Sequence, residues 1–232
     1  MMRQFLAAAA ICATVLCGPA LAGNQPVVVE LYTSQGCSSC PPADKLLGEL
    51  AQRDDVIALA LHVDYWDYIG WKDIFGSPAH TQRQKYYAKA AGERTIYTPQ
   101  LIVGGKEHVV GYRPMELAQL IAAHRAAPDR VKIAVVRTGT VVRIDAQMVE
   151  GPAVRMVVQM ARYSPKEVVA IERGENSGNT FTYHNVVLDW AVVGEWDGAA
   201  PLSLEVAAPA GPAAVIIQQA GFGPVMAAAR LK

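Results

Sequence analysis

The sequence has no excess of charge of either sign, because 21 lysines and arginines balance 21 aspartates and glutamates over 232 residues. A protein that binds nucleic acid through its phosphates needs a basic surplus, so nucleic acid is not expected as a partner. Beyond its N-terminal segment the sequence also lacks a run of about 18 apolar residues, so no integral membrane span is expected. Its 52% of hydrophobic residues are enough to form a sizeable core.

The N-terminal segment has the pattern of a secretory signal peptide. Arg3 supplies a positive charge, residues 5–17 are apolar and rich in alanine, and the tripeptide Ala-Leu-Ala at 20–22 fits the small-residue rule for cleavage. We expect residues 1–22 to be removed and the protein to be exported, to the periplasm or to the medium.

Cysteine is scarce, with four in the whole sequence. Loss of the signal peptide removes Cys12 and Cys17, which leaves Cys37 and Cys40. Export places this pair where disulfides persist. A bridge between residues three apart closes a loop too small to stabilise the fold much, so the pair is expected to be reactive.

The cysteine pair lies between an apolar strand pattern at residues 27–33 and a helical pattern that runs to about residue 53. Pro41 and Pro42 fit the first turn of that helix, where backbone N–H groups have no intrahelical acceptor. Cys37 is therefore expected at or just before a helix N-terminus, a position that lowers a thiol pKa below its usual value of about 8.5.

These positions predict different roles for the two cysteines. Cys37 is expected to be exposed and to attack, and Cys40 to resolve the mixed disulfide that results. Ser38 and Ser39 offer hydrogen-bond donors to a Cys37 thiolate, which stabilises the reduced form.

The rest of the first half alternates strands and helices. The pattern predicts a strand at residues 56–63, a helix at 77–91, two short strands at 100–103 and 107–110, and a helix from residue 114. Between the second strand and the second helix lies an aromatic segment, residues 65–75. It is expected either to pack against the second half of the chain or to form a wall of the site.

The element order, with Cys37-Ser38-Ser39-Cys40 and with Thr98-Pro99 before an edge strand, resembles the thioredoxin superfamily. The longer segments 31–44 and 62–67 resemble a secreted family catalogued as a domain of unknown function, number 1223. The resemblance implies an α/β, thioredoxin-like domain at residues 23–127 and no established activity. It also implies that Thr98 and Pro99 bind substrate and that Pro99 is cis; the alternative is a trans proline that begins an edge strand.

The sequence departs from the thioredoxin pattern in two places. Gly36 occupies the position where a tryptophan usually precedes the first cysteine. A glycine there either allows the backbone of a partner to approach closely or serves only to form the turn. Thioredoxins carry a buried acid on the preceding strand; Leu31 is at the matching offset and Glu30 is one residue away. Glu30 is therefore expected either to support Cys40 or to face a polar surface or pair with a base.

Residues 128–232 show a period of two, typical of strands, without a strong helix pattern. The pattern predicts strands at residues 131–136, 140–145, 154–161, 168–171, 184–193, 202–206 and 213–219. Turn-rich segments separate them, including residues 173–179. These strands predict a smaller all-β, sandwich-like domain with no cysteine. His184 and Asn185, at the start of a predicted strand, are expected to have a cross-strand or turn-bonding role.

Together these features predict an exported thiol–disulfide oxidoreductase that needs no cofactor and acts on protein or small-molecule thiols and disulfides. One alternative is a non-catalytic binding or assembly protein with a static disulfide. Another is a copper carrier that binds its metal through Cys37, Cys40 and His62, because thiolates with imidazole suit copper or zinc.

Overall fold

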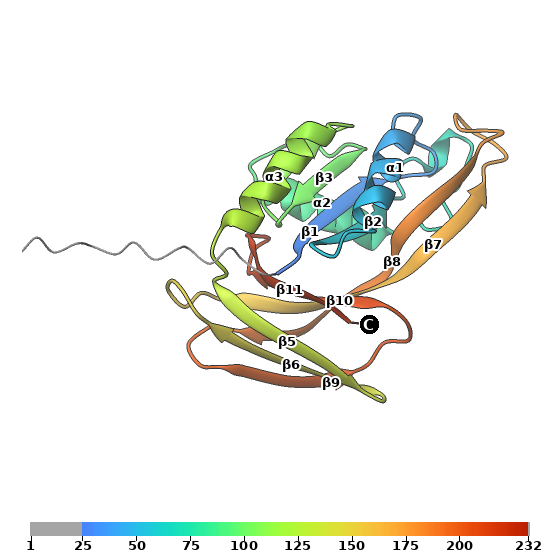
Figure 1. The fold of residues 1–232 in the computed structure, drawn as a ribbon. Coiled ribbons are helices and arrows are strands. Elements are labelled where there is room, and N and C mark those ends of the chain that lie inside the picture. Colours follow the sequence, from blue (N-terminus) through green and yellow to red (C-terminus); the bar gives the residue numbers. More distant parts are fainter. Residues whose placement is uncertain (1–24, 232) are drawn as a thin grey trace, which may run out of the picture.

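The structure is a computed structural model that describes residues 25–231. It contains a large sheet with helices on both faces and a small sheet packed against one end of it (Figure 1). The expected signal peptide, residues 1–22, lies outside the described residues.

The first half follows the element order predicted from the sequence. It contains β1 (Val27–Thr33), α1 (Pro41–Leu50), β2 (Val56–His62), the 3-10 turn η1 (Asp67–Ile69), α2 (Pro78–Ala90), β3 (Gln100–Val103), β4 (Glu107–Val110) and α3 (Pro114–Ala126). Each α-helix has a proline in its first turn, where the missing N–H costs no hydrogen bond. Ser77 caps α2 by accepting a hydrogen bond from the Ala79 N–H at 3.2 Å.

The second half consists of strands within the described residues. They are β5 (Val131–Thr138), β6 (Val141–Met148), β7 (Met156–Ala170), β8 (Thr180–Trp196), β9 (Leu202–Ala207), β10 (Ala213–Gln219) and β11 (Val225–Leu231). β7 is one long strand where the sequence predicts two. Pro165 lies within it, at a position that has no pairing partner on β8. A proline cannot donate a ladder hydrogen bond, so it resembles a strand end in the sequence. β11 escaped prediction because alanine, its main residue, is a weak strand former.

The two halves share one sheet. Its strand order is β11-β10-β7-β8-β2-β1-β3-β4, and β5, β6 and β9 form the second, antiparallel sheet. β1 and β2 are parallel, and β8 joins β2 in parallel through the pair Ala60↔Val186. The predicted sandwich at residues 128–232 therefore does not close on itself. Four of its strands extend the first-half sheet, and the small sheet packs on that extension.

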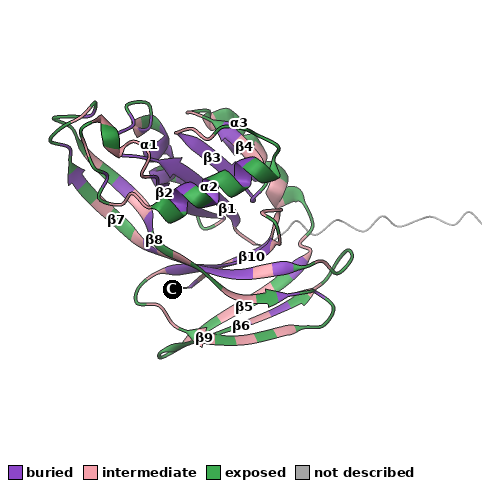
Figure 2. Cartoon of the chain, turned by 180° about the vertical axis from the view of Figure 1, so that it is seen from behind, coloured by how far each residue is buried: buried purple, intermediate pink, exposed green. Residues whose placement is uncertain are grey.

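The side chains of β1 alternate between two cores. Val29 and Leu31 pack with α1 and α3, whereas Val28 and Tyr32 pack with α2 and with strands of the second half. Figure 2 shows α2 lying across the face opposite to α1 and α3. Because Glu30 is an even-numbered residue of β1, its side chain belongs to the α2 face.

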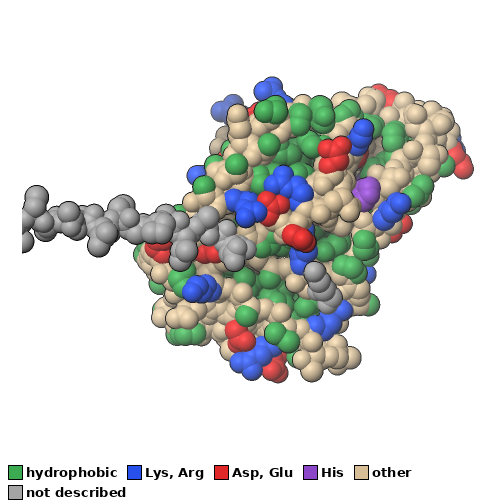
Figure 3. Space-filling model, viewed as in Figure 1, with side chains coloured by type: hydrophobic (Ala, Val, Ile, Leu, Met, Phe, Trp, Pro, Cys, Tyr) green, Lys and Arg blue, Asp and Glu red, His purple; other side chains and the backbone are tan. Residues whose placement is uncertain are grey.

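The surface carries charges of both signs. Figure 3 shows lysines, arginines and acids interspersed on the face seen in Figure 1, without a large patch of one sign. No helix among residues 25–231 is long and apolar enough to cross a membrane.

Candidate redox site

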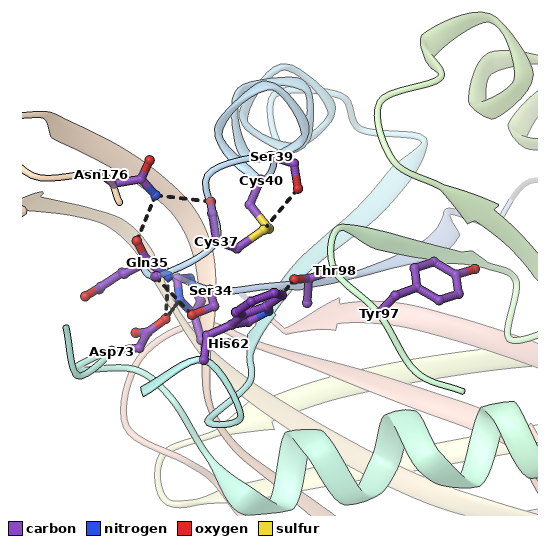
Figure 4. Close-up of a disulfide and its surroundings, with 12 residues drawn as sticks. Ser34, Gln35, Cys37, Ser39, Cys40, His62, Asp73, Tyr97, Thr98 and Asn176 are labelled. Carbon is purple, nitrogen blue, oxygen red and sulfur yellow. Dashed lines mark hydrogen bonds and ion pairs between the residues drawn. A yellow bond between two sulfur atoms is a disulfide. The ribbon is translucent and has the colours of Figure 1, made fainter. Parts of the chain in front are cut away.

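Cys37 and Cys40 form a disulfide at the start of α1 (Figure 4). Cys40 is the N-cap residue, and its N–H donates a hydrogen bond to the Cys37 carbonyl at 3.2 Å. The helix N-terminus favours negative charge, so a thiolate on Cys37 would be stabilised when the disulfide opens. The position predicted for the pair is confirmed.

The disulfide is less accessible than the sequence suggests. The sequence predicts an exposed Cys37, but only 2% of its surface reaches solvent, and Cys40 is completely buried. The exposed residues of the turn are Ser38 and Ser39. The Ser39 hydroxyl oxygen lies 3.4 Å from Cys37 Sγ, within reach as a donor to a thiolate. A partner must therefore displace neighbouring groups to reach the sulfur.

The peptide bond between Thr98 and Pro99 is cis, as the family resemblance implies. β3 begins at the next residue and pairs antiparallel with β1, which places Thr98 and Pro99 beside the end of β1 that leads to Cys37. Figure 4 shows Thr98 on the side of the disulfide away from Asn176.

The aromatic segment both lines the site and packs against the second half. Trp66 Nε1 donates a hydrogen bond to Thr98 Oγ1 at 2.7 Å, and a Cβ built on Gly36 would lie 3.3 Å from Trp66 Cβ. Gly36 thus makes room for a side chain of its own chain. Trp71 Nε1 donates to Gln35 Oε1 at 2.8 Å, and its ring packs against β7 and β8. Both roles considered for this segment are present.

A pair of buried ionisable side chains lies behind the redox turn. His62 Nδ1 is 2.7 Å from Asp73 Oδ2, and both side chains are fully buried. The same oxygen accepts a hydrogen bond from the Gln35 N–H at 2.8 Å. Burial would raise the pKa of Asp73, but the His62 charge and hydrogen bond and two backbone N–H donors hold it below its usual value. Asp73 therefore anchors both the imidazole and the chain that leads to Cys37.

The sequence-based prediction missed Asp44, which lies one turn along α1 from Cys40. Its N–H donates to the Cys40 carbonyl at 3.1 Å, and the residue is 7% exposed. Burial raises the pKa of Asp44 to about 7, with partial opposition from the His62 charge and the Thr33 hydroxyl. The signal that could have revealed it is an acid four residues after Cys40, beside the apolar stripe of the helix.

Asn176 connects the second half of the chain to the redox turn. It lies in the β7–β8 loop, is 7% exposed, and donates through Nδ2 to the carbonyl oxygens of Gln35 at 2.9 Å and Cys37 at 3.1 Å (Figure 4). The sequence predicts only a turn at residues 173–179. No local pattern could reveal a contact across 139 residues.

Glu30 is not part of the redox site. Its carboxylate accepts hydrogen bonds from Arg83 at 2.8 and 2.9 Å and from the Tyr87 hydroxyl at 2.7 Å, on the α2 face of the sheet. The guanidinium of Arg83 also lies 3.7 Å from the centre of the Trp190 ring. The expectation that Glu30 pairs with a base is confirmed, and a role in supporting Cys40 is wrong.

A groove of about 660 Å³ runs between α1 and the start of β8. Its lining includes Pro41, Pro42, Asp44, Lys45, Tyr112 and His184. The His184 ring packs directly on α1, because a Cβ on Gly48 would lie 2.7 Å from its Nδ1. Asn185 Nδ2 donates to the Ala58 carbonyl at 2.8 Å, which confirms the expected cross-strand role.

Within residues 25–231, no group of three or more His, Cys, Asp or Glu side chains is arranged to hold a metal ion. The Nδ1 atom of His62 is hydrogen-bonded to Asp73. The ligand set of Cys37, Cys40 and His62 considered from the sequence is not assembled.

Comparison with known proteins gives a family and a related solved structure. Residues 28–219 match the sequence model of a family described as protein of unknown function, DUF1223. The fold is similar to the X-ray crystal structure of an Agrobacterium tumefaciens protein determined in structural genomics, with a TM-score of 0.77 and 33% sequence identity. The similarity covers 88% of this chain and 93% of that chain. A comparison with curated proteins finds no match.

Proposed function

This chain belongs to the DUF1223 family, described as of unknown function, and we propose that it is a thiol–disulfide oxidoreductase that uses Cys37 and Cys40. The observation that carries the proposal is the position of the disulfide at the N-terminus of α1, with Thr98 on its other flank just before β3. A helix N-terminus stabilises a thiolate. A disulfide between residues three apart contributes little to the stability of the fold, so we infer that its role is to be reduced and re-formed.

The same site supports a thioredoxin-like assignment for residues 23–127. The order of elements from β1 to α3 and the strand order β2-β1-β3-β4, with β1 and β2 parallel, agree with that fold. Residues 128–232 then act as a support that extends the sheet and holds the redox turn through Asn176.

The exchange proceeds in two displacements. A partner thiolate attacks Cys37 Sγ, the bond between Cys37 and Cys40 breaks, and its electron pair goes to Cys40 Sγ. A second thiolate of the partner attacks the partner's own sulfur in the mixed disulfide, so that the partner leaves oxidised and the protein holds a dithiol. The reverse sequence reduces a partner disulfide. Thr98 and Pro99 offer the backbone against which an extended partner docks.

We also propose that the protein is exported to the periplasm or the medium. The support is the signal-peptide pattern at residues 1–22 and the chemistry of the site, since a disulfide persists in those compartments.

A second candidate is a non-catalytic binding or assembly protein with a static disulfide. The observation that favours it is the 2% exposure of Cys37, which limits access to the sulfur. The two candidates differ in whether the disulfide reacts.

Reduction of insulin by dithiothreitol tests the proposal. The wild-type protein is expected to accelerate the reaction and Cys37→Ser to have no effect on it. Ser177→Ala, an exposed substitution in the β7–β8 loop, serves as the control and is expected to match the wild type. A wild-type disulfide that glutathione buffers cannot open would instead establish the static candidate.

A further inference from the structure

We propose that Asp44 stores the proton that Cys40 gains and loses as the disulfide opens and closes, with the buried His62 stabilising its carboxylate. This inference rests on the proposed thiol–disulfide exchange and names the group that completes it. Three features of the structure support it: the place of Asp44 on the helix, its burial, and the free polar atoms around it.

Asp44 and Cys40 lie on the same row of α1. Cys40 already has helical backbone angles, φ −79° and ψ −34°, and its carbonyl accepts the Asp44 N–H. Side chains four residues apart on a helix are neighbours, with Cβ atoms about 5–6 Å apart. Helical side chains also lean toward the N-terminus, so the Asp44 carboxyl is directed toward the turn that contains Cys40.

Three buried polar atoms gather at this point. Asp44 Oδ1, Thr33 Oγ1 and His62 Nε2 have no hydrogen-bond partner among the protein groups of residues 25–231. Thr33 and His62 are paired across β1 and β2, and both influence the ionisation of Asp44. Buried polar atoms are nearly always bonded, so these three atoms beside the first turn of α1 are available to take up a proton or a hydrogen bond.

The charged and titratable groups around Asp44 come from several elements. They are Cys40 at the start of α1, His62 at the end of β2, Asp73 from the aromatic segment, and Tyr183 from β8. Burial raises the pKa of Tyr183, and the charges of Asp44 and Asp73 raise it further, so the phenol stays protonated. For Asp44, burial and Asp73 favour the neutral carboxyl and His62 favours the carboxylate. Both forms are therefore accessible at neutral pH.

The proton balance of the exchange follows from this arrangement. When a partner opens the disulfide, the electron pair of the broken bond goes to Cys40 Sγ, and the Asp44 proton moves to that sulfur. The products are a Cys40 thiol and an Asp44 carboxylate beside His62. On closing, the carboxylate takes the proton back, the Cys40 thiolate attacks Cys37 Sγ in the mixed disulfide, and the partner thiolate leaves.

A single-turnover reaction of the reduced protein with dithiobis-nitrobenzoate separates the two steps. The first coloured thiolate leaves when Cys37 attacks the reagent, and the second leaves when Cys40 attacks Cys37. In Asp44→Asn we expect an unchanged first release and a second release slowed about 100-fold, as loss of a general base predicts. The rate of the second release increases with pH, and in Asp44→Asn this increase should occur at a higher pH than in the wild type. Asp44→Glu should restore part of the rate, and Glu49→Gln, an exposed acid of the same helix, should match the wild type.

Each outcome has one meaning. A second release in Asp44→Asn that is as fast as in the wild type overturns the role of Asp44 while leaving the exchange proposal standing. The absence of any first release from the wild type refutes the exchange itself. If Asp44→Asn does not fold, the infrared difference spectrum between oxidised and reduced wild type replaces it. A change in the protonated carboxyl band is expected there, and an unchanged band overturns the inference.

Discussion

The side-chain amide of Asn176 donates a hydrogen bond to the carbonyl oxygen of Cys37 at 3.1 Å, and a second to that of Gln35 at 2.9 Å. The donor lies in the β7–β8 loop and the acceptors lie in the turn before α1. The second half of the chain therefore takes part in building the redox site, because it fixes the backbone of the cysteine that is expected to attack.

Replacement of Asn176 by alanine should destabilise the oxidised protein by roughly 1–3 kcal/mol, because it leaves two buried carbonyl groups without their donor. The free energy of unfolding in urea measures this effect. Ser177→Ala, in the same loop, is the matched control. An Asn176→Ala protein as stable as that control would show that the two hydrogen bonds do not hold the turn.

The wild type should lose stability relative to Asp44→Asn as pH rises from about 4 to about 7. Burial raises the pKa of Asp44 from 3.8 to about 7, so the folded chain holds this proton more tightly than the unfolded chain does. The stability present below pH 4 is lost as Asp44 ionises, on the order of 4 kcal/mol by pH 8. Urea unfolding at several pH values should show this loss, measured relative to Asp44→Asn, in the wild type and in Glu49→Gln. Asp44→Asn should lack it and be the more stable protein at pH 8; equal pH profiles would contradict the account.

Glu30→Gln should destabilise the protein without removing its redox activity. The substitution leaves the buried guanidinium of Arg83 without its counter-charge, and breaking a buried pair costs roughly 3–5 kcal/mol. Arg155→Ala, which removes an exposed pair with Glu195, should stay close to the wild type in the same unfolding assay. A folded Glu30→Gln protein that no longer reduces insulin would place Glu30 in the chemistry after all.

Trp66→Ala should speed the reduction of the disulfide by a small thiol. The Trp66 side chain contacts Gly36, the residue before Cys37, and donates a hydrogen bond to Thr98. It therefore connects the two segments on either side of the disulfide, which is almost inaccessible to solvent. The rate of opening by dithiothreitol, followed by alkylation and mass measurement, is expected to rise several-fold. Tyr68→Ala is the control, since that aromatic side chain is 81% exposed. Equal rates in the two variants would mean that the indole does not limit access.

The sequence is enough to predict the elements of the first half and the helix N-terminus at the cysteines, because both depend on local signals. A proline in a first helical turn and an apolar strand run both act within a few residues. The cis bond before Pro99 is what the family resemblance implies.

What could not be predicted depends on contacts between distant segments. The join of β8 to β2 rests on one residue pair, Ala60↔Val186, and Asn176 reaches the turn only once that sheet exists. The burial of Cys37 likewise depends on how the aromatic segment folds back. Asp44 looks like an ordinary first-turn acid in the sequence, and its environment appears only when β2, β8 and Asp73 are in place.

Trapping of mixed disulfides tests the central claim most directly. In Cys40→Ala the attacking cysteine remains and the resolving one is absent, so covalent adducts with exported thiol proteins should accumulate and disappear on reduction. Cys37→Ala, which keeps Cys40 alone and completely buried, should form none. Adducts in Cys40→Ala and none in Cys37→Ala are the predicted result. The absence of adducts from both variants, or equal amounts in both, would contradict a thiol–disulfide exchange led by Cys37.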